Sequence, residues 1–253
     1  MSQSKLKDTL TFCLGIVLIG VVIQTAGALK GDDLVFPGVD VILRAFGRLI
    51  TTGKTYALIW TTIKHLILSV ALSTVIGVLL GMAMGMLPFM RGLFRPVMTL
   101  LQAIPMIILM VIVMVVASYD KVPVIAATLI LVPMIAQAAC EGCMRIEPEL
   151  IDVYRMNSGF NLRVLLQVYL PLMAGYLRQA WINAVGMGVK LAVSTEYLVQ
   201  TKNSLGKAVH TSAYFNEYQD IYAYALVMIL LVLLVSEAPL AIARWIGQIK
   251  KQA

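Results

Sequence analysis

Two charged residues in the fifth apolar stretch of this 253-residue chain are the ones best placed to act on an ion. Lys190 and Glu196 lie within 176–199, where a charge near the centre of a bilayer costs about 2.5–3.5 kcal/mol on insertion scales. Their six-residue separation in a helix is roughly 9 Å along the axis and about 240° around it, so they are poorly placed to pair. Lys190 therefore reaches outward to the membrane surface, finds a partner on another span, or faces a watery path, where it would attract an anionic or polar solute.

Three other motifs are weak candidates for a nucleotide-binding or metal-binding site. Gly53-Lys54-Thr55 looks like the end of a phosphate-binding loop but lacks the upstream glycine of that loop. Cys140 and Cys143 form a single CxxC with no second pair and no nearby histidine, which favours packing thiols over a zinc site. His65 and His210 are far apart in the sequence. We therefore expect no nucleotide-binding loop and no metal site.

A polar island at 145–171 interrupts the apolar sequence. It predicts two short amphipathic helices broken near 157–159. Pro148 suits a first helical turn, and the acidic residues Glu149 and Asp152 place negative charge at the positive end of the helix dipole. Leu170-Pro171 is expected to stop the second helix and begin the next span. A polar segment of this kind contacts a partner protein or, alternatively, lies on the lipid surface.

Composition indicates a membrane protein. The chain is 60% hydrophobic and 13% charged, and its apolar residues form blocks near the ~20 residues that cross a bilayer. The net charge of +7 does not suggest nucleic acid, because the basic residues flank apolar blocks and suit contact with membrane lipid. We predict an all-α fold with six spans, at 9–28, 59–86, 93–117, 122–142, 176–199 and 221–246.

The distribution of basic residues predicts the orientation. Eleven lie on the side of the termini and the island, and seven on the other side. The positive-inside rule then places both termini and the island in the cytoplasm of a multi-pass protein. Segment 29–55 falls outside, and its helical apolar periodicity, with Asp40 placed to pair with Arg44, predicts an amphipathic helix on the outer interface.

Small residues and a proline mark two of the spans. Gly77, Gly81 and Gly85 form a double GxxxG in the second span, which favours close helix packing within one subunit or, alternatively, a dimer interface or pore wall. Pro105 in the third span predicts a kink, which serves packing or shapes a gate.

The island carries a resemblance to a known family. Asp152-Val153-Tyr154, Ser158 and Leu170-Pro171 stand at the spacing of the cytoplasmic signature of binding-protein-dependent importer permeases of the ABC class. Phe36-Pro37-Gly38, the glycine-rich second span, Ile104-Pro105 and Ser194-Thr195-Glu196 are similar to the nitrate/sulfonate/taurine branch of that family. The resemblance covers most of the chain.

The resemblance implies a function. The fold would be one domain over 1–253, of the type I ABC importer permease kind, in the inner membrane of a bacterium. Two permease copies, expected to be identical, would line one path, with a separate ABC ATPase subunit holding ATP and Mg and an extracytoplasmic substrate-binding protein delivering a small polar or anionic solute. Because the chemistry would lie in the ATPase, this chain would hold no catalytic residue and no cofactor. The expected path residues are Pro105, Lys190 and Glu196. The expected ATPase contacts are Glu149, Asp152, Val153, Tyr154, Ser158, Gly159, Leu170 and Pro171.

The signature departs from the family pattern in two places. Asp152-Val153-Tyr154 replaces Glu-Ala-Ala, and Ser158 replaces a glycine that here follows one residue late, as Gly159. The bulkier side chains predict a differently shaped groove on the ATPase. Two other classes stay open: an ATP-independent carrier, against which we see no repeated half and no spread of acids within the spans, and a degenerate permease acting as a membrane scaffold.

Overall fold

The structure is a computed structural model that describes residues 35–147 and 164–252, with side chains as far as Val235, and the isolated positions 15, 18, 21, 25 and 149. All regular structure in the described residues is helical. The elements are α2 (Val39–Thr51), α3 (Gly53–Met86), α4 (Pro88–Ala103), α5 (Met106–Val116), α6 (Val122–Met144), the π-helical turn η1 (Leu165–Tyr169), α9 (Leu170–Val199), α10 (Leu205–Tyr214) and α11 (Tyr218–Gln252). The predicted span at 9–28 lies outside the described residues, apart from isolated positions.

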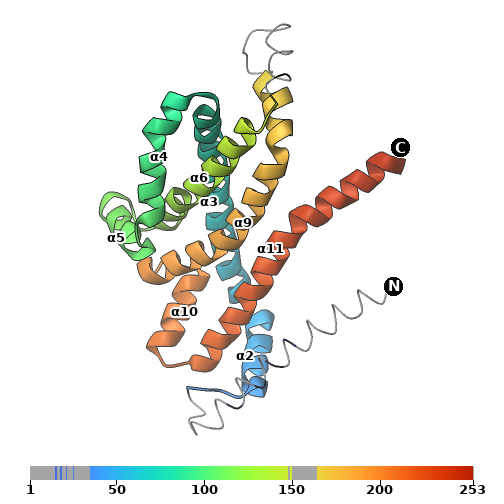
Figure 1. Ribbon diagram of the computed structural model, residues 1–253. Coiled ribbons are helices and arrows are strands. Elements are labelled where there is room, and N and C mark those ends of the chain that lie inside the picture. Colours follow the sequence, from blue (N-terminus) through green and yellow to red (C-terminus); the bar gives the residue numbers. More distant parts are fainter. Residues whose placement is uncertain are drawn as a thin grey trace.

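Helix α6 forms the centre of the bundle, between α3 and α9 (Figure 1). Its alanines at 126, 127, 136 and 139 are fully buried. Small side chains let neighbouring helix backbones approach closely, which is how membrane helices gain packing contacts without a hydrophobic driving force between them. Helices α4 and α5 lie on one side of this centre, and α11 leans away from it along its length.

The three glycines of the double GxxxG lie in the contact between α3 and α6. A Cβ on Gly81 would lie 2.3 Å from the backbone oxygen of Ala136, and one on Gly77 would lie 2.8 Å from the Cβ of Ile135. At Gly85 the added atom would lie 2.6 Å from the Cβ of Cys143. Any larger residue would push the two helices apart, so these positions pack within the chain.

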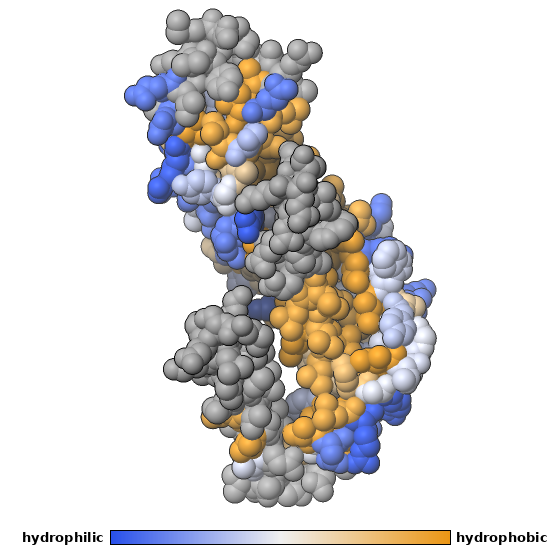
Figure 2. Space-filling view, turned by 90° about the vertical axis from the view of Figure 1, so that its right-hand side faces the viewer, coloured by the Kyte–Doolittle hydropathy of each residue, from blue (hydrophilic) through white to orange (hydrophobic). Residues whose placement is uncertain are grey.

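Helix α3 places several hydroxyl side chains inside the bundle and large apolar side chains on its outer face. Its buried face carries hydroxyl side chains, including those of Thr62, Ser69 and Ser73. Its exposed face carries large apolar side chains, including Leu72 and Val75, the latter 60% exposed. Water would not tolerate such a face, whereas lipid does, so this side of α3 faces the bilayer. Figure 2 shows apolar surface running through the middle of one face of the molecule, with hydrophilic residues gathered at its edges.

Helices that are long and apolar enough to cross a membrane occur at Gly53–Met86, Val122–Met144 and Tyr218–Val235 of the described part of the chain. The pair Pro88–Ala103 and Met106–Val116 passes the same test together, but it bends by 104° at its break. The span predicted over 93–117, with a kink at Pro105, is thus sharply bent there, and the pair forms either one broken span or a re-entrant segment. Pro105 supplies no N–H and disfavours helix at the residue before it, so the helix breaks there.

One correction concerns Leu170-Pro171, which was expected to end a helix. The helix runs without interruption from Val164 through the π-helical turn Leu165–Tyr169 into α9. A π turn widens the helix locally and alters the bonding just before Pro171, where the ordinary pattern would require the N–H that proline lacks. The start of α9 is thus continuous with the last described residues of the island, 164–169.

One end of the bundle is formed by α2, α10 and the start of α11 (Figure 1). Helix α2 buries Ile42, Ala45 and Leu49 on one face. The predicted pair of Asp40 with Arg44 is present on the other face, and this Arg44 guanidinium holds the pKa of the Asp40 carboxyl below its ordinary value.

A second ion pair ties α2 to α11. Arg48 of α2 binds Asp220 in the first turn of α11, across 172 positions of sequence. The contact joins the start of α11 to α2, at the same end of the molecule.

Candidate functional site

The carboxyl group of Glu196 is buried at the junction of α3, α9 and α10, with no exposed surface. The hydroxyl of Thr62 donates to one carboxyl oxygen at 2.8 Å, and the backbone N–H of Gly206 donates to the same oxygen at 3.2 Å. The Nδ1 of His65 lies 2.7 Å from the other oxygen. This acid therefore has partners on two other helices and does not pair with Lys190, in line with the geometry expected from the sequence.

The loop from α9 to α10 brings the polypeptide back onto Glu196. Gln200 and Asn203 adopt positive φ angles of 55° and 53°, which turn the chain sharply after α9. Ser204 then caps α10 by accepting a hydrogen bond from the N–H of Lys207. A Cβ on Gly206 would lie 2.5 Å from the backbone of α9, so only glycine permits this approach.

Sequence reasoning missed the partners of Glu196. Thr62 and His65 are three residues apart, on one face of α3, and both point inward to the acid. A buried acid in a membrane span needs hydrogen-bond partners, and a Thr and a His at helical spacing in another span were the available signal. His65 was instead considered only as a metal ligand.

The described residues hold no cluster of His, Cys, Asp and Glu that could bind a metal ion. The single CxxC motif lies at the contact of α6 with α3, where both Cys140 and Cys143 are buried thiols. Cys143 packs against the glycine stripe of α3.

The second candidate site is the exposed side of α6 and α9. Between Val122 and Cys143, the exposed side chains of α6 are those of Gln137 and Glu141, and the rest of that stretch is buried or half-buried. This is the reverse of α3, whose exposed face is apolar. An apolar bundle that exposes its polar side chains on one face directs that face toward water or a partner, because lipid would leave them without hydrogen bonds.

Helix α9 continues the same polar side. The exposed polar residues along α9 after Tyr176 are Arg178, Gln179, Asn183, Lys190 and Ser194. The last four recur every four to seven residues, so they follow one stripe along the helix. Lys190 is thus an exposed cation on that stripe.

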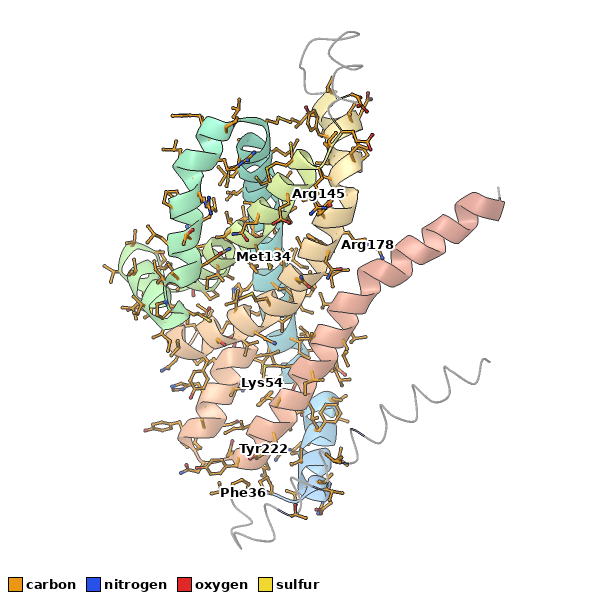
Figure 3. All side chains as sticks on the ribbon, in the orientation of Figure 1. Phe36, Lys54, Met134, Arg145, Arg178 and Tyr222 are labelled. Atoms are coloured by element: carbon orange, nitrogen blue, oxygen red, sulfur yellow. The ribbon has the colours of Figure 1, made fainter. Side chains whose placement is uncertain are left out.

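A groove of about 390 Å³ lies between α6 and α9 on this side. Its lining residues are Met134, Gln137, Ala138, Glu141, Gly175, Tyr176, Gln179, Ala180 and Asn183. Figure 3 shows Met134 on α6 and Arg145 just after that helix alongside Arg178 of α9, with Lys54, Tyr222 and Phe36 toward the other end of the molecule. The groove therefore occupies the half of the bundle nearest the island.

The other residues predicted for a site are spread over the molecule. Pro105 is exposed at the break between α4 and α5. Glu149 is exposed, Leu170 is half-buried, and Pro171 is exposed in the first turn of α9. The predicted ATPase contacts Asp152, Val153, Tyr154, Ser158 and Gly159 lie outside the described residues. Of the predicted path residues, Lys190 lies on the exposed stripe, whereas Glu196 lies in the interior, at the junction described above.

Comparison with known proteins places this geometry in context. The family described as "Binding-protein-dependent transport system inner membrane component" matches residues 73–250. Two solved structures of the MetNI methionine ABC transporter in inward-facing conformations, a native and a SeMet-soaked CY5 crystal form, align with a TM-score of 0.64. Their identities to this chain are 20% and 19%, and each alignment covers 74% of this chain and 93% of the other. A search among curated proteins finds no match. The structural likeness supports a common fold.

Proposed function

Because the chain belongs to the family of binding-protein-dependent transport system inner membrane components and is the permease subunit of an ABC importer, we propose that it carries a small polar or anionic solute along the exposed side of α6 and α9. A second, identical copy faces this side and completes the path. Sequence features of the second span and of Ser194-Thr195-Glu196 support the nitrate/sulfonate/taurine branch.

The polar side of α6 and α9 is the observation that carries the proposal. Gln137 and Glu141 on α6 and Asn183 and Lys190 on α9 are all exposed within long helices, whereas the middle of the exposed face of α3, from Ile67 to Leu79, carries mainly large apolar side chains. Each would cost free energy against lipid. A hydrated path shared with a second copy gives these groups water or solute as partners.

ATP hydrolysis takes place in a separate cytoplasmic ATPase, and segment 145–171 couples that subunit to the path. The helix that begins at Val164 continues unbroken into α9, which carries the polar stripe. A displacement of the segment by the ATPase therefore moves α9 and one wall of the groove. Nucleotide shifts the path between inward-open and outward-open states only by the difference in its binding to the two.

The protein lies in the bacterial inner membrane with both termini and segment 145–171 in the cytoplasm. The opposite end, with α2 and α10, then faces the extracytoplasmic side, where a binding protein delivers the solute. The excess of basic residues on the side of the segment supports this orientation.

Replacement of residues 148–163 by a Gly/Ser linker of equal length tests the coupling. The tagged native chain should capture an ABC ATPase from its own membranes, and the linker variant should lose it while still eluting as a folded membrane protein. A control variant with Gly/Ser in place of Phe215–Glu217, at the other end, should keep the ATPase.

The other possible outcomes would contradict the coupling role or indicate a different function. Capture of the ATPase by the linker variant would contradict the coupling role. A native chain that binds no ATPase would indicate an ATP-independent carrier. Binding without any ATP-dependent change in the accessibility of the path would indicate a scaffold.

A further inference from the structure

We propose that the end of the bundle formed by α2, α10 and the start of α11 holds a binding site for a small oxyanion, that is, a solute carrying a sulfonate, phosphate or carboxylate group. The site is a cavity of about 550 Å³, lined by the ends of α2 and α3, the loop before α10, α10 itself and the start of α11. Figure 3 shows Lys54, one of its residues, at this end of the molecule. The cavity shares no lining residue with the groove between α6 and α9, so the inference goes beyond the proposed path and does not depend on it.

Three buried hydroxyl groups line this cavity without a hydrogen-bond partner. Thr55, Ser212 and Tyr224 are 3%, 5% and 8% exposed, and none of their hydroxyls bonds to a described residue. Within the described part of the chain, the one unpaired side-chain oxygen that is also sealed from open space belongs to Thr201, so these three hydroxyls have access to open space. Buried hydroxyls in folded proteins nearly always have a partner, and a molecule in the cavity supplies one.

Three lysines of the lining carry positive charge toward the same space. Lys54, Lys202 and Lys207 form no ion pair with any residue that the structure describes. Lys54 lies in the first turn of α3 and Lys207 in the first turn of α10, and neither turn holds an acidic residue. A cation at the positive end of a helix dipole is the reverse of the favourable arrangement, and an anion bound beside it relieves the repulsion.

The two acidic residues of the lining do not balance these lysines. Asp220 already binds Arg48 of α2. Glu217 immediately precedes α11, and its carbonyl oxygen accepts the N–H of Asp220, so its charge lies at the positive end of that helix. The three lysines and Arg48 give four positive charges against two negative ones, a net formal charge of +2 around the cavity.

The chemistry of this lining fits an oxyanion. Lysine ammonium groups only donate hydrogen bonds, and hydroxyls can donate as well, whereas a sulfonate or phosphate presents several acceptor oxygens and a negative charge. The volume falls within the range of sites for small organic molecules, so the cavity accommodates more than a bare inorganic ion. The phosphate of a membrane lipid offers the same chemistry as a free anion, and the experiment below separates the two sources.

Isothermal titration calorimetry of the purified full-length chain in non-ionic detergent tests the proposal. Sodium ethanesulfonate and sodium phosphate are titrated at constant ionic strength. Tyr224→Phe and Thr55→Val each remove a cavity hydroxyl with little change of shape, and Lys207→Met removes one charge. Lys121→Met is the matched control, because Lys121 is an exposed lysine outside the cavity.

We expect the native chain to bind both anions. Lys207→Met should weaken binding on the order of tenfold, and each hydroxyl variant roughly three- to tenfold, as expected for loss of a charged and of a neutral hydrogen bond. Lys121→Met should bind as the native chain does. Without anion, Tyr224→Phe should unfold at the native temperature, because its hydroxyl has no protein partner to lose; this separates a binding defect from a folding defect.

No binding of either anion by the native chain, or equal affinities in all cavity variants, would overturn the proposal. Weakened binding in Lys190→Met but not in Lys207→Met would also overturn it, and would place the anion on the proposed path instead.

Nanodiscs identify the source of the oxyanion, at a salt concentration high enough to screen the membrane charge. Equal affinity for ethanesulfonate in phosphatidylcholine discs with and without phosphatidylglycerol would support a free solute. A loss of affinity with phosphatidylglycerol would support the same site with the lipid phosphate as its occupant.

Discussion

Replacement of Glu196 by alanine should destabilise the bundle strongly, because the carboxyl group has no exposed surface and joins three elements. The change removes the acceptor for the Thr62 hydroxyl at 2.8 Å and for the Gly206 N–H at 3.2 Å, and the partner of His65 at 2.7 Å. Removing one partner from such a buried network costs about 3–5 kcal/mol, since the groups left behind stay desolvated. That is a large share of the ~5–15 kcal/mol that holds a domain folded.

Thermal unfolding of the purified protein in detergent measures the effect. For a chain of this size, a loss of about 3–5 kcal/mol lowers Tm by roughly 6–20 °C. Glu196→Gln keeps the side-chain volume and one acceptor oxygen, so we expect about 1–2 kcal/mol and a correspondingly smaller shift.

Ser194→Ala serves as the matched control, because Ser194 is exposed on the same helix, two residues before Glu196. It should change stability by less than about 0.5 kcal/mol. If Glu196→Ala unfolds at the same temperature as Ser194→Ala, the acid is not part of a buried network and the reasoning fails.

Three further variants test the packing and the membrane faces. Gly81→Ala places a Cβ 2.3 Å from a backbone oxygen of α6, so it should lower the free energy of unfolding by about 1–3 kcal/mol. Gly92→Ala, whose Cβ meets open space, should leave that free energy unchanged. Equal Tm values for the two variants would contradict the close approach of α3 and α6. A double-mutant cycle on Arg48 and Asp220 should give a coupling energy below about 1 kcal/mol that weakens with salt, because the Arg48 side chain is 58% exposed. A coupling energy of several kcal/mol would instead show an ion pair shielded from water. Leu72→Lys should weaken membrane insertion by about 2.5–3.5 kcal/mol in a glycosylation-mapping assay, and normal insertion would show that this face of α3 does not meet lipid.

The sequence predicted the helical class and the approximate place of most described helices, because long apolar blocks have few other ways to satisfy their backbones in lipid. It did not predict how sharply the chain turns at Ile104-Pro105. A proline predicts a disturbance of the helix, but the 104° between α4 and α5 depends on what each half packs against. The continuity of the helix through Pro171 depends similarly on a local π turn that no residue pattern announces.

The candidate sites were predicted less completely. Lys190 and Glu196 stood out as charges in a span, but the partners of Glu196 depend on the rotation of α3, whose apolar residues surround the helix too evenly to reveal it. Gln137 and Glu141 were overlooked because they lie near the inner end of a very apolar span. Their role as candidate path residues can be recognised only from the burial of the side chains, because they are nearly all that α6 exposes.

The opposed faces of α3 also constrain how this sequence can vary over evolution. On the inner face, Gly81 and Ser73 touch neighbouring helices, so size limits the choice of residue and polarity matters little. On the outer face, Val75 and Leu72 meet fluid hydrocarbon, so polarity is the limit and size is free. Related chains should therefore drift among Val, Leu, Ile, Met and Phe at positions 72 and 75, while positions 73, 77 and 81 remain small, whether Gly, Ala or Ser.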